Sequence, residues 1–342
     1  MRVFLFGYYG YGNFGDEVLL SNAVELLNEL KRDEKMEISI LLPRRCKVPT
    51  NHRKVNRFNI IEVVLNILRS DVVIGGGGGI FQDETSFRSF LYYSSIVFIS
   101  LIFRKKVILL CHGIGPLKRE ISRWMMRKML SSDLLFPILR DEVSYRYSRM
   151  ISKNSTLGVD LMILKPPKIL KNPCRRKDKV SMVLRSIPKN LDEIAKFLKS
   201  MDVEEIDLLI FSPNEDYDLN RRIERLFERK FVINLFMDHN DLVESMMTSR
   251  FIVTERLHGA IFATLVGTPF ISNSRIKKIN RVFRDYPGRC DFNDTFEFLE
   301  TVVEMEKFDF DGYRKRKLRR WEELRGEVLR RLDEILIGNR EG

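Results

Sequence analysis

The first stretch that could do chemistry is GYYGYGNFGDEVLL, residues 7–20. It contains a G-x-G-x-x-G pattern at Gly10, Gly12 and Gly15, after an apolar run and before a helical pattern. Enzymes that bind a dinucleotide carry this pattern at the same place, because the N-terminus of the helix holds the pyrophosphate. A nicotinamide dinucleotide is therefore the first ligand to test against the neighbouring residues.

Those neighbours argue against a dinucleotide. Asp16 and Glu17 follow the last glycine directly, and two carboxylates in the first turn of a helix would repel a pyrophosphate. The acidic ribose ligand expected after the second strand is missing, and Arg44 and Arg45 stand there instead. The loop therefore indicates either a tight turn with Asp16 as helix N-cap, or a ligand loop in which Asn13 and Asp16 face a substrate.

A second glycine-rich stretch, VVIGGGGGIFQD (72–83), follows another apolar run. Five consecutive glycines pack a core poorly and are entropically costly, so they indicate a place where the backbone comes close to a ligand. The backbone N–H groups of Gly77 and Gly78 are then candidates to bind an anion. Asp83, which closes the stretch, is a candidate to hold sugar hydroxyls.

Two further loops follow the next apolar runs. CHGIGPL (111–117) places His112 in a loop, and LRDEVS (139–144) places Arg140 directly after a strand. Open α/β sheets bind ligands at the carboxyl ends of their strands. The side chains of these loops are therefore expected at one edge of one sheet.

The second half of the chain repeats this geometry. In TERLHGAIFATLVGTPFI (254–271) a strand ends at Thr254, and Arg256 and His258 open the next helix. A helix N-terminus with an arginine binds anions, although a lone histidine there can equally be a cap or a core residue. Arg185, after the first strand of this half, is either a further anion ligand or part of a surface ion pair.

Apolar runs and helical patterns alternate along the chain, which predicts parallel strands joined by helices. The strands expected in the first half are 2–6, 37–42, 71–75, 106–111 and 135–139, with a helix from Asp16 to about Lys31. A linker is predicted around 165–178 from its prolines and charges. The strands expected after it are 179–185, 206–212, 231–236, 250–255 and 268–272, with helices at 190–201, 257–267 and 313–337.

The predicted fold is therefore α/β, with two Rossmann-like domains facing a central cleft, which is a GT-B-like architecture. The N-terminal domain is expected over residues 1–167, with the glycine-rich loops on the acceptor side. The C-terminal domain is expected over residues 178–312, on the donor side. The last helix, within residues 313–342, can pack back on the N-terminal domain.

Composition limits the function classes. The net charge of +12 fits nucleic acid, an anionic membrane or an anionic substrate, but no nucleic-acid motif occurs. The basic amphipathic stretches 119–130 and 313–321 are either membrane-surface helices or ordinary helices with solvated arginines. The four cysteines form no CxxC pair, so no metal site or disulfide framework is expected. Together with the absence of a leader before strand 2–6, this predicts a cytoplasmic protein, with the inner face of the cell membrane as the alternative.

In order along the chain, these motifs resemble those of the polysaccharide pyruvyl transferases. The resemblance rests on GYYGYGNFGDEVLL, VVIGGGGGIFQD, HGIGP, LRDEVS, VLRS, LGVDL and ERLHGAIFATLVGTP, and it covers most of the chain from residue 5 to about residue 285. It implies a GT-B-like enzyme that takes the enolpyruvyl group of phosphoenolpyruvate and attaches it across two sugar hydroxyls as a cyclic ketal, releasing phosphate. It implies neither a metal nor a nicotinamide cofactor.

The resemblance also implies roles for residues. Arg140, Arg256 and His258 are donor-site residues, with His258 as general acid or base, because imidazole titrates nearest neutral pH. A lysine in SRIKKINRVF joins them; Lys278 fits the family pattern best, with Lys277 as the other register. The acceptor is expected to be a saccharide of a cell-surface polysaccharide or its lipid-linked precursor, held by Asn13, Asp16 and Asp83. Should His258 not move the proton, His112 is the nearest replacement.

The competing enzyme class is a GT-B nucleotide-sugar glycosyltransferase. Such an enzyme commonly carries an acidic ribose ligand in its C-terminal half, and no E-x-x-x-x-x-x-E pattern follows Arg256. A non-enzymatic membrane-surface protein is the other alternative, carried by the basic stretches alone. The motifs favour the pyruvyl transferase over both.

Overall fold

The computed structural model describes residues 1–30, 36–46, 51–166 and 176–337, and it divides the chain into two compact units. The first unit consists of Met1–Pro166 and Trp321–Gly342, and the second of Pro167–Arg320. The linker expected around 165–178 falls largely on 167–175, and Cys174 with it, outside the described residues. Cys46, Cys111 and Cys290, within the described residues, form no disulfide.

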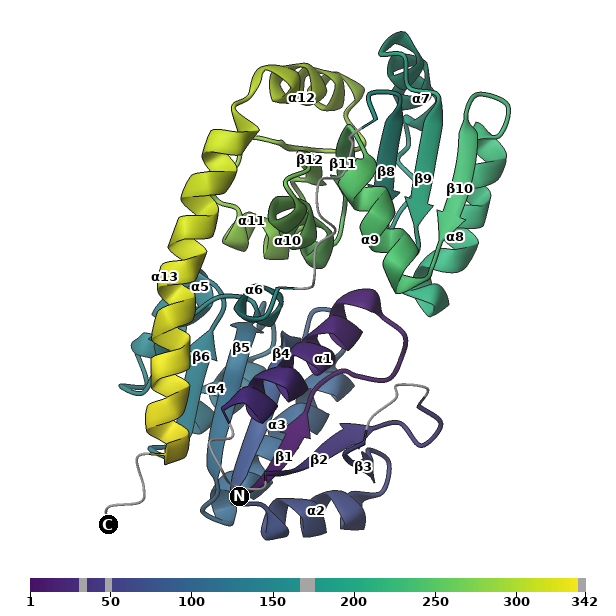
Figure 1. Cartoon of the computed structure of the whole chain (residues 1–342). Helices are drawn as coiled ribbons and strands as arrows, with labels where there is room; N and C mark the ends of the chain where they lie inside the picture. The colour runs from purple at the N-terminus through teal and green to yellow at the C-terminus, as the bar shows by residue number, and fades with distance from the viewer. Residues whose placement is uncertain (31–35, 47–50, 167–175, 338–342) are drawn as a thin grey trace. The chain divides into compact units, whose positions relative to one another are not determined.

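The first unit contains a parallel sheet of seven strands in the order β3-β2-β1-β4-β5-β6-β7 (Figure 1). Its strands are β1 (Arg2–Phe6), β2 (Glu37–Leu42), β3 (Arg53–Asn56), β4 (Val72–Phe81), β5 (Lys106–Ile114), β6 (Leu135–Leu139) and β7 (Thr156–Leu157). The helices between them are α1 (Phe14–Glu29), α2 (Ile60–Arg69), α3 (Phe87–Ile102), α4 (Glu120–Leu130), α5 (Glu142–Arg149) and α6 (Leu161–Leu164).

The second unit repeats the plan with six parallel strands in the order β10-β9-β8-β11-β12-β13. Its strands are β8 (Lys179–Val183), β9 (Glu205–Leu209), β10 (Val232–Phe236), β11 (Phe251–Thr254), β12 (Phe270–Asn273) and β13 (Arg289–Cys290). Its helices are α7 (Leu191–Ser200), α8 (Pro213–Phe227), α9 (His239–Thr248), α10 (Leu257–Val266), α11 (Lys277–Val282) and α12 (Thr295–Lys307). The predicted α/β class with two parallel sheets is confirmed.

Each sheet has one topological switch point. In the first unit, β1 pairs with β2 on one side and β4 on the other, so the connections leave β1 and β4 in opposite directions. In the second unit, β8 and β11 have the same relation. Ligands of open α/β sheets bind at such points, beyond the carboxyl ends of the strands. A ligand is therefore expected beside β1 and β4 in the first unit, or beside β8 and β11 in the second.

The strand predictions fail at the glycines. We expected β4 to end at Gly75, but it continues through all five glycines to Phe81 and stays paired with β5 across a bulge after Gly78. Strand β5 also continues further than expected, to Ile114, and pairs there with the glycine run. His112 therefore lies in the strand and not in a loop. The patterns missed the continuation because glycine carries no apolar side chain that would mark a buried strand.

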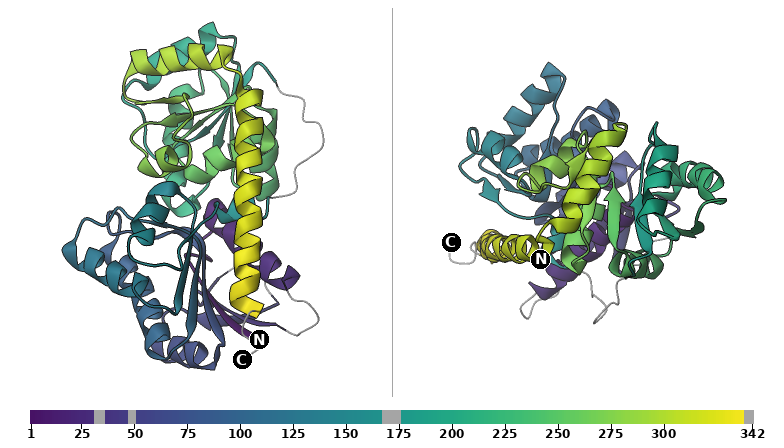
Figure 2. Two further views of the ribbon diagram at one scale, coloured as in Figure 1. Left: turned by 90° about the vertical axis from the view of Figure 1, so that its left-hand side faces the viewer. Right: turned by 90° about the horizontal axis from the view of Figure 1, so that it is seen from above.

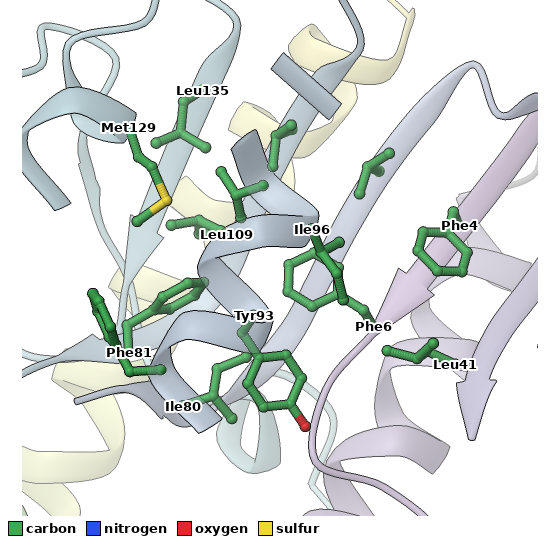
Figure 3. Close-up of a cluster of buried hydrophobic side chains, with 14 of the residues drawn as sticks. Phe4, Phe6, Leu41, Ile80, Phe81, Tyr93, Ile96, Leu109, Met129 and Leu135 are labelled. Atoms are coloured by element: carbon green, nitrogen blue, oxygen red, sulfur yellow. The ribbon is translucent and has the colours of Figure 1, made fainter. Parts of the chain in front are cut away.

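The main core of the first unit lies between one face of its sheet and helices α2, α3 and α4 (Figure 3). Phe4 and Phe6 of β1 and Leu109 of β5 contact Tyr93 and Ile96 of α3 in one buried cluster. Helix α1 covers the opposite face, where a Cβ on Gly76 would meet Leu5 and Ala23 (Figure 1). Both faces of the sheet are thus covered, as in other parallel sheets.

Tyr9 explains why two of the glycines cannot be larger. Its buried hydroxyl donates a hydrogen bond to the carbonyl of Gly76. A Cβ on Gly76 would collide with that hydroxyl, and a Cβ on Gly7 would lie 2.6 Å from a carbon of the same ring. The glycines at 7 and 76 therefore make room for a buried tyrosine at the switch point.

Helix α13 (Phe310–Ile337) is one continuous helix in every view (Figure 2). Its first residues, up to Arg320, belong to the second unit, and those from Trp321 on belong to the first. In the second unit, Arg314 donates to the carbonyls of Thr264 and Leu265 at the end of α10. In the first unit, Val328 is fully buried and would lie 2.7 Å from a Cβ on Gly158.

The glycine at 76 gives a stability prediction. We expect Gly76→Ala to lower the free energy of unfolding by about 1–3 kcal/mol, because the new methyl group overpacks the site of Tyr9. The matched control is Gly326→Ala in α13, where a Cβ meets nothing within 4 Å and a helix former should raise stability by about 0.5–1 kcal/mol. Urea unfolding followed by tryptophan fluorescence measures both, because Trp124 and Trp321 belong to the first unit. Equal effects would contradict the packing explanation.

Candidate functional sites

The loop after β1 is closed by side chains of α1. Asn13 is the N-cap of α1, and its Oδ1 accepts a hydrogen bond from the Asp16 backbone N–H at 3.3 Å. The prediction that Asp16 caps the helix is therefore wrong, and the helix begins two residues earlier, at Phe14. Asp16 lies in the first turn of α1, at this edge of the sheet.

Glu17 occupies the place where a dinucleotide would put its phosphate. Its Oε1 accepts hydrogen bonds from the backbone N–H groups of Gly10, at 2.8 Å, and Gly12, at 3.0 Å. Burial raises the pKa of this carboxyl above its usual range, although the loop N–H groups act in the opposite direction. Gly10 and Gly12 of the G-x-G-x-x-G pattern thus donate to the protein's own carboxylate and not to a ligand's phosphate.

The glycine run of β4 meets this loop at the switch point. Gly77 and Gly78 have φ angles of +78° and +89°, which side chains rarely adopt. A Cβ on Gly78 would lie 3.8 Å from Oδ1 of Asp16. The structure therefore brings together Asp16 and Gly78, two residues predicted for one site.

His112 lies inside the sheet and is fully buried. Its Nδ1 is 3.2 Å from the carbonyl oxygen of Gly78, which can only accept, so Nδ1 carries the proton. The buried Nε2 has no hydrogen-bond partner and would lie 2.7 Å from a Cβ on Gly75. Burial lowers the pKa of His112 to about 3, so the neutral imidazole fixes the glycine run of β4.

Arg140 forms a buried ion pair. Its Nη1 is 2.9 Å from Oδ2 of Asp160, which is itself fully buried and caps α6. Its backbone N–H donates to the carbonyl of His112, so the pair lies beside β5. Removing one partner of such a pair leaves an uncompensated buried charge, which makes Arg140 a residue that holds its loop in place.

Asp83 also serves the backbone. Its two carboxylate oxygens accept hydrogen bonds from the N–H groups of Lys118, at 2.6 Å, and Arg119, at 2.8 Å. Although burial opposes it, these bonds hold the pKa of Asp83 below its usual range. Its side chain is fully buried, so it anchors the segment after β5 where the sequence had suggested a sugar ligand.

In the second unit, Glu255 connects the two loops of the switch point. Its Oε2 accepts from the backbone N–H groups of Arg185, at 2.7 Å, and Ser186, at 2.9 Å, both after β8. Its Oε1 accepts from Nδ2 of Asn273, at 2.8 Å, at the end of β12. Sequence reasoning missed this buried carboxylate, although it stands directly before Arg256.

Arg256 is oriented by two acidic residues of α8. Its Nη2 binds Asp216 and lies 3.0 Å from Oε2 of Glu215. The side chain is only 11% exposed, and its buried Nε has no hydrogen-bond partner. Burial raises the pKa of Asp216, although Arg256 acts in the opposite direction. Both carboxylates bind Nη2, which shares one edge of the guanidinium with the unpartnered Nε.

The start of α10 differs from that of α1. Arg256 is its N-cap residue but makes no side-chain capping hydrogen bond, and no acidic residue lies in the first turn. Thr254 shapes this start, since its Oγ1 accepts from the Arg256 N–H at 3.0 Å. His258 lies in the first turn and is partly buried. Such an N-terminus attracts anions, because its N–H groups and the helix dipole both favour negative charge.

The other two cations predicted for this site are Arg185 and Lys278. Arg185 is half exposed, and its Nη2 is 3.6 Å from Glu215, so it shares a partner with Arg256. Lys278 lies in α11, which packs against α10. The structure thus brings together Arg185, Arg256 and the first turn of α10, with Lys278 on a neighbouring helix.

The described residues contain neither a metal-binding cluster nor a membrane-spanning helix. No group of three or more histidine, cysteine, aspartate or glutamate side chains within them could hold a metal ion. Their helices include none that is both long and apolar enough to cross a bilayer.

The comparison with protein families identified one match. The family model described as polysaccharide pyruvyl transferase matches residues 13–274, which is most of the chain. No curated protein matches the sequence.

Solved structures with a similar fold include the following three. A putative UDP-N-acetylglucosamine 2-epimerase from Listeria monocytogenes has a TM-score of 0.62 at 9% identity, covering 100% of this chain and 98% of its own. The UDP-GlcNAc 2-epimerase from Neisseria meningitidis bound to UDP-GlcNAc has a TM-score of 0.60 at 14% identity, covering 99% and 100%. Anabaena Alr3699/HepE in complex with UDP and glucose has a TM-score of 0.59 at 10% identity, covering 99% and 100%. At such identities the likeness shows the fold, which is the two-Rossmann-domain, GT-B-like fold.

The buried imidazole of His112 predicts an acid sensitivity. Its pKa is about 3 in the folded state and near 6.5 in the unfolded chain, so the unfolded state binds the proton first as the pH falls. The stability from this residue is therefore complete above pH 6.5 and is lost toward pH 3, by about 3 kcal/mol at pH 4. His112→Asn keeps an N–H donor for Gly78 but does not titrate, so its stability should fall less over this range. Urea unfolding at each pH measures the difference, and parallel curves would contradict it.

Proposed function

The chain belongs to the polysaccharide pyruvyl transferase family, and we propose that it transfers the enolpyruvyl group of phosphoenolpyruvate to a saccharide acceptor. In this reaction the methylene carbon of the donor takes a proton, one sugar hydroxyl attacks the adjacent carbon, and phosphate leaves. A second hydroxyl then closes the ketal ring. One hydroxyl proton ends on the methyl group and the other leaves with phosphate, so the reaction balances.

The observation that carries the proposal is the contrast between the first turns of α1 and α10. The start of α1 is capped by Asn13, carries Asp16 and Glu17, and has its loop N–H groups bound to a carboxylate. The start of α10 has no side-chain cap and no acid, and Arg256 lies beside it. A donor with about three negative charges at neutral pH is therefore assigned to the second unit.

Arg256 is the proposed ligand of the donor anion. A planar guanidinium binds carboxylate or phosphate through two parallel hydrogen bonds, and its orientation decides whether it can. Asp216 and Glu215 fix that orientation before a ligand arrives, which lowers the entropy lost on binding. Arg185 and Lys278 supply further positive charge in the same unit.

His258 is the proposed acid or base. It is the second residue of α10 and is partly buried, next to the proposed anion site. Imidazole transfers protons near neutral pH, and the donor's methylene carbon needs one. Arg140 is assigned a positioning role instead, because it is paired with Asp160 inside the first unit, whereas the proposed anion site belongs to the second unit.

The acceptor is assigned to the switch point of the first unit. Asn13, Asp16 and the backbone at Gly77 and Gly78 offer hydrogen-bond donors and acceptors without a net positive charge. Sugar hydroxyls suit such a surface, whereas an anion does not. The acceptor class we propose is a cell-surface polysaccharide or its lipid-linked precursor.

The competing function is a nucleotide-sugar glycosyltransferase, since structural neighbours are named as complexes with UDP-GlcNAc or with UDP and glucose. Thermal unfolding with phosphoenolpyruvate, inorganic phosphate or UDP-GlcNAc separates the two. We expect phosphoenolpyruvate to raise the melting temperature most, because a ligand that binds only the folded state stabilises it by mass action. Mass spectrometry of a sugar panel then detects the pyruvate adduct with phosphate release. A shift by UDP-GlcNAc and none by phosphoenolpyruvate would favour the glycosyltransferase.

Substitutions at two residues separate donor binding from proton transfer. Arg256→Ala should weaken phosphoenolpyruvate binding by about 2–5 kcal/mol, and Arg256→Lys should restore only part, because an ammonium lacks the planar fork. His258→Gln should leave donor binding intact and lower turnover roughly 10²–10⁴-fold.

The control for these variants is Arg221→Ala on α8, an exposed arginine paired with Glu224, which should change neither quantity. Calorimetry measures binding, and phosphate release measures turnover. Near-normal turnover in His258→Gln would remove the proton-transfer role, and His112, the replacement predicted from the sequence, is fully buried within the sheet.

A further inference from the structure

Helix α2 exposes an apolar face. Phe58, Ile60 and Ile61 are 72%, 72% and 74% exposed, and Leu65 and Leu68 on the same helix are also exposed. Ile61, Leu65 and Leu68 recur at the spacing of one helix face. The opposite face is apolar too, since Val63 and Ile67 belong to the buried core. Single exposed apolar side chains are ordinary, but five within eleven residues form a patch of the kind that marks an interaction site.

The end of α3 extends this patch. Ile102 and Phe103 are both exposed, and the next-but-one residue, Lys105, donates hydrogen bonds to the carbonyls of Leu68 and Ser70 at 2.8 Å. The end of α3 is thereby tied to the end of α2. We call Phe58, Ile60, Ile61, Leu65, Leu68, Ile102 and Phe103 the apolar face.

The charges beside the apolar face are mainly positive, and the exposed Asp71 after α2 is paired with Arg2. Arg53, Lys54 and Arg69 are the exposed charged residues between positions 51 and 69, and Arg104 follows Phe103. The one acid in that range, Glu62, is partly buried and accepts a hydrogen bond from the Asn56 N–H. An apolar surface with a basic rim complements an anionic surface that is apolar beneath.

The apolar face begins next to the acceptor switch point. Arg57, directly before Phe58, is buried, and its guanidinium lies 5.9 and 5.1 Å from the ring centres of Tyr8 and Tyr11, in the loop after β1. Its Nη2 donates to the hydroxyl of Tyr93 at 2.8 Å. The patch is therefore anchored at the carboxyl edge of the sheet and extends along α2 toward the opposite edge.

We propose that the apolar face docks on an anionic membrane surface. Its aromatic and aliphatic side chains would enter the boundary between headgroups and acyl chains, and the basic rim would contact anionic headgroups. A lipid-linked sugar held in that membrane would then lie near the loop after β1. The docking itself stands apart from the proposed donor chemistry, since it rests on exposure and charge alone.

This surface differs from the two basic stretches predicted from the sequence. In residues 313–321, Arg314 binds main-chain carbonyls of α10, and Lys317 binds the carbonyl of Val282 and Asp285, so these cations serve the second unit. Helix α4 does expose Ile121 and Trp124 among arginines and lysines. It is therefore the rival docking helix in the test.

Vesicle flotation tests the proposal without any catalytic readout. The wild-type chain should bind vesicles of phosphatidylcholine with phosphatidylglycerol, and bind vesicles of phosphatidylcholine alone far more weakly. The double variant Ile61→Glu with Leu65→Glu should lower the partition coefficient at least tenfold. Its control is Phe296→Glu on α12, an equally exposed apolar residue of the second unit, which should bind as the wild type does. Arg53→Gln with Lys54→Gln should lower binding to the anionic vesicles only.

Four outcomes would overturn the proposal. The first is a wild-type chain that does not bind the anionic vesicles, and the second is undiminished binding by the double variant. The third is a loss caused by Trp124→Glu and not by the double variant, which would assign docking to α4. The fourth is a wild-type dimer, seen by sedimentation velocity without lipid, that the double variant separates, which would make the apolar face an interface between two copies. Circular dichroism confirms that each variant is folded.

Discussion

The backbone N–H groups at the carboxyl ends of parallel strands have no partner in the sheet, and this constraint governs both units. Each unit meets it with a glutamate. Glu17 accepts from Gly10 and Gly12 beside β1, and Glu255 accepts from Arg185 and Ser186 beside β8. A buried backbone donor without a partner is costly, so each carboxylate holds its loop in one conformation. The conformation of these two loops determines which backbone and side-chain groups can contact a ligand.

The two units meet this constraint with opposite electrostatic results. Around α1 the N–H groups are already bound and the acids face the loop, which suits a polyhydroxylated and uncharged ligand. Around α10, Glu255 serves the β8 loop, and the helix N-terminus remains without a side-chain cap. Asp216 and Glu215 bind Nη2 of Arg256 and orient its guanidinium. This contrast is the reason that we propose the second unit, and not the first, for the anionic donor.

The fold could be predicted because buried parallel strands are apolar runs, and those runs placed the loops at strand ends. The prediction failed where that signal is absent, as in the glycines of β4 and at His112 in β5. The site loops were found by the same rule, but the partners of their side chains were not. Arg140 with Asp160, and Arg256 with Asp216, join residues 20 and 40 positions apart. Such pairs depend on tertiary packing, whereas the local Asn13 cap was within reach of the sequence.

The first unit has a consequence for how the protein is made. Its core is built from two separate pieces of chain, and Trp321, Leu324, Val328, Leu332 and Ile335 of α13 are all buried. On the ribosome, residues 1–166 emerge long before these side chains exist. The nascent domain therefore waits with an apolar strip uncovered while the whole second unit is translated. The first unit therefore completes its core only after the second unit has been translated and α13 has followed it.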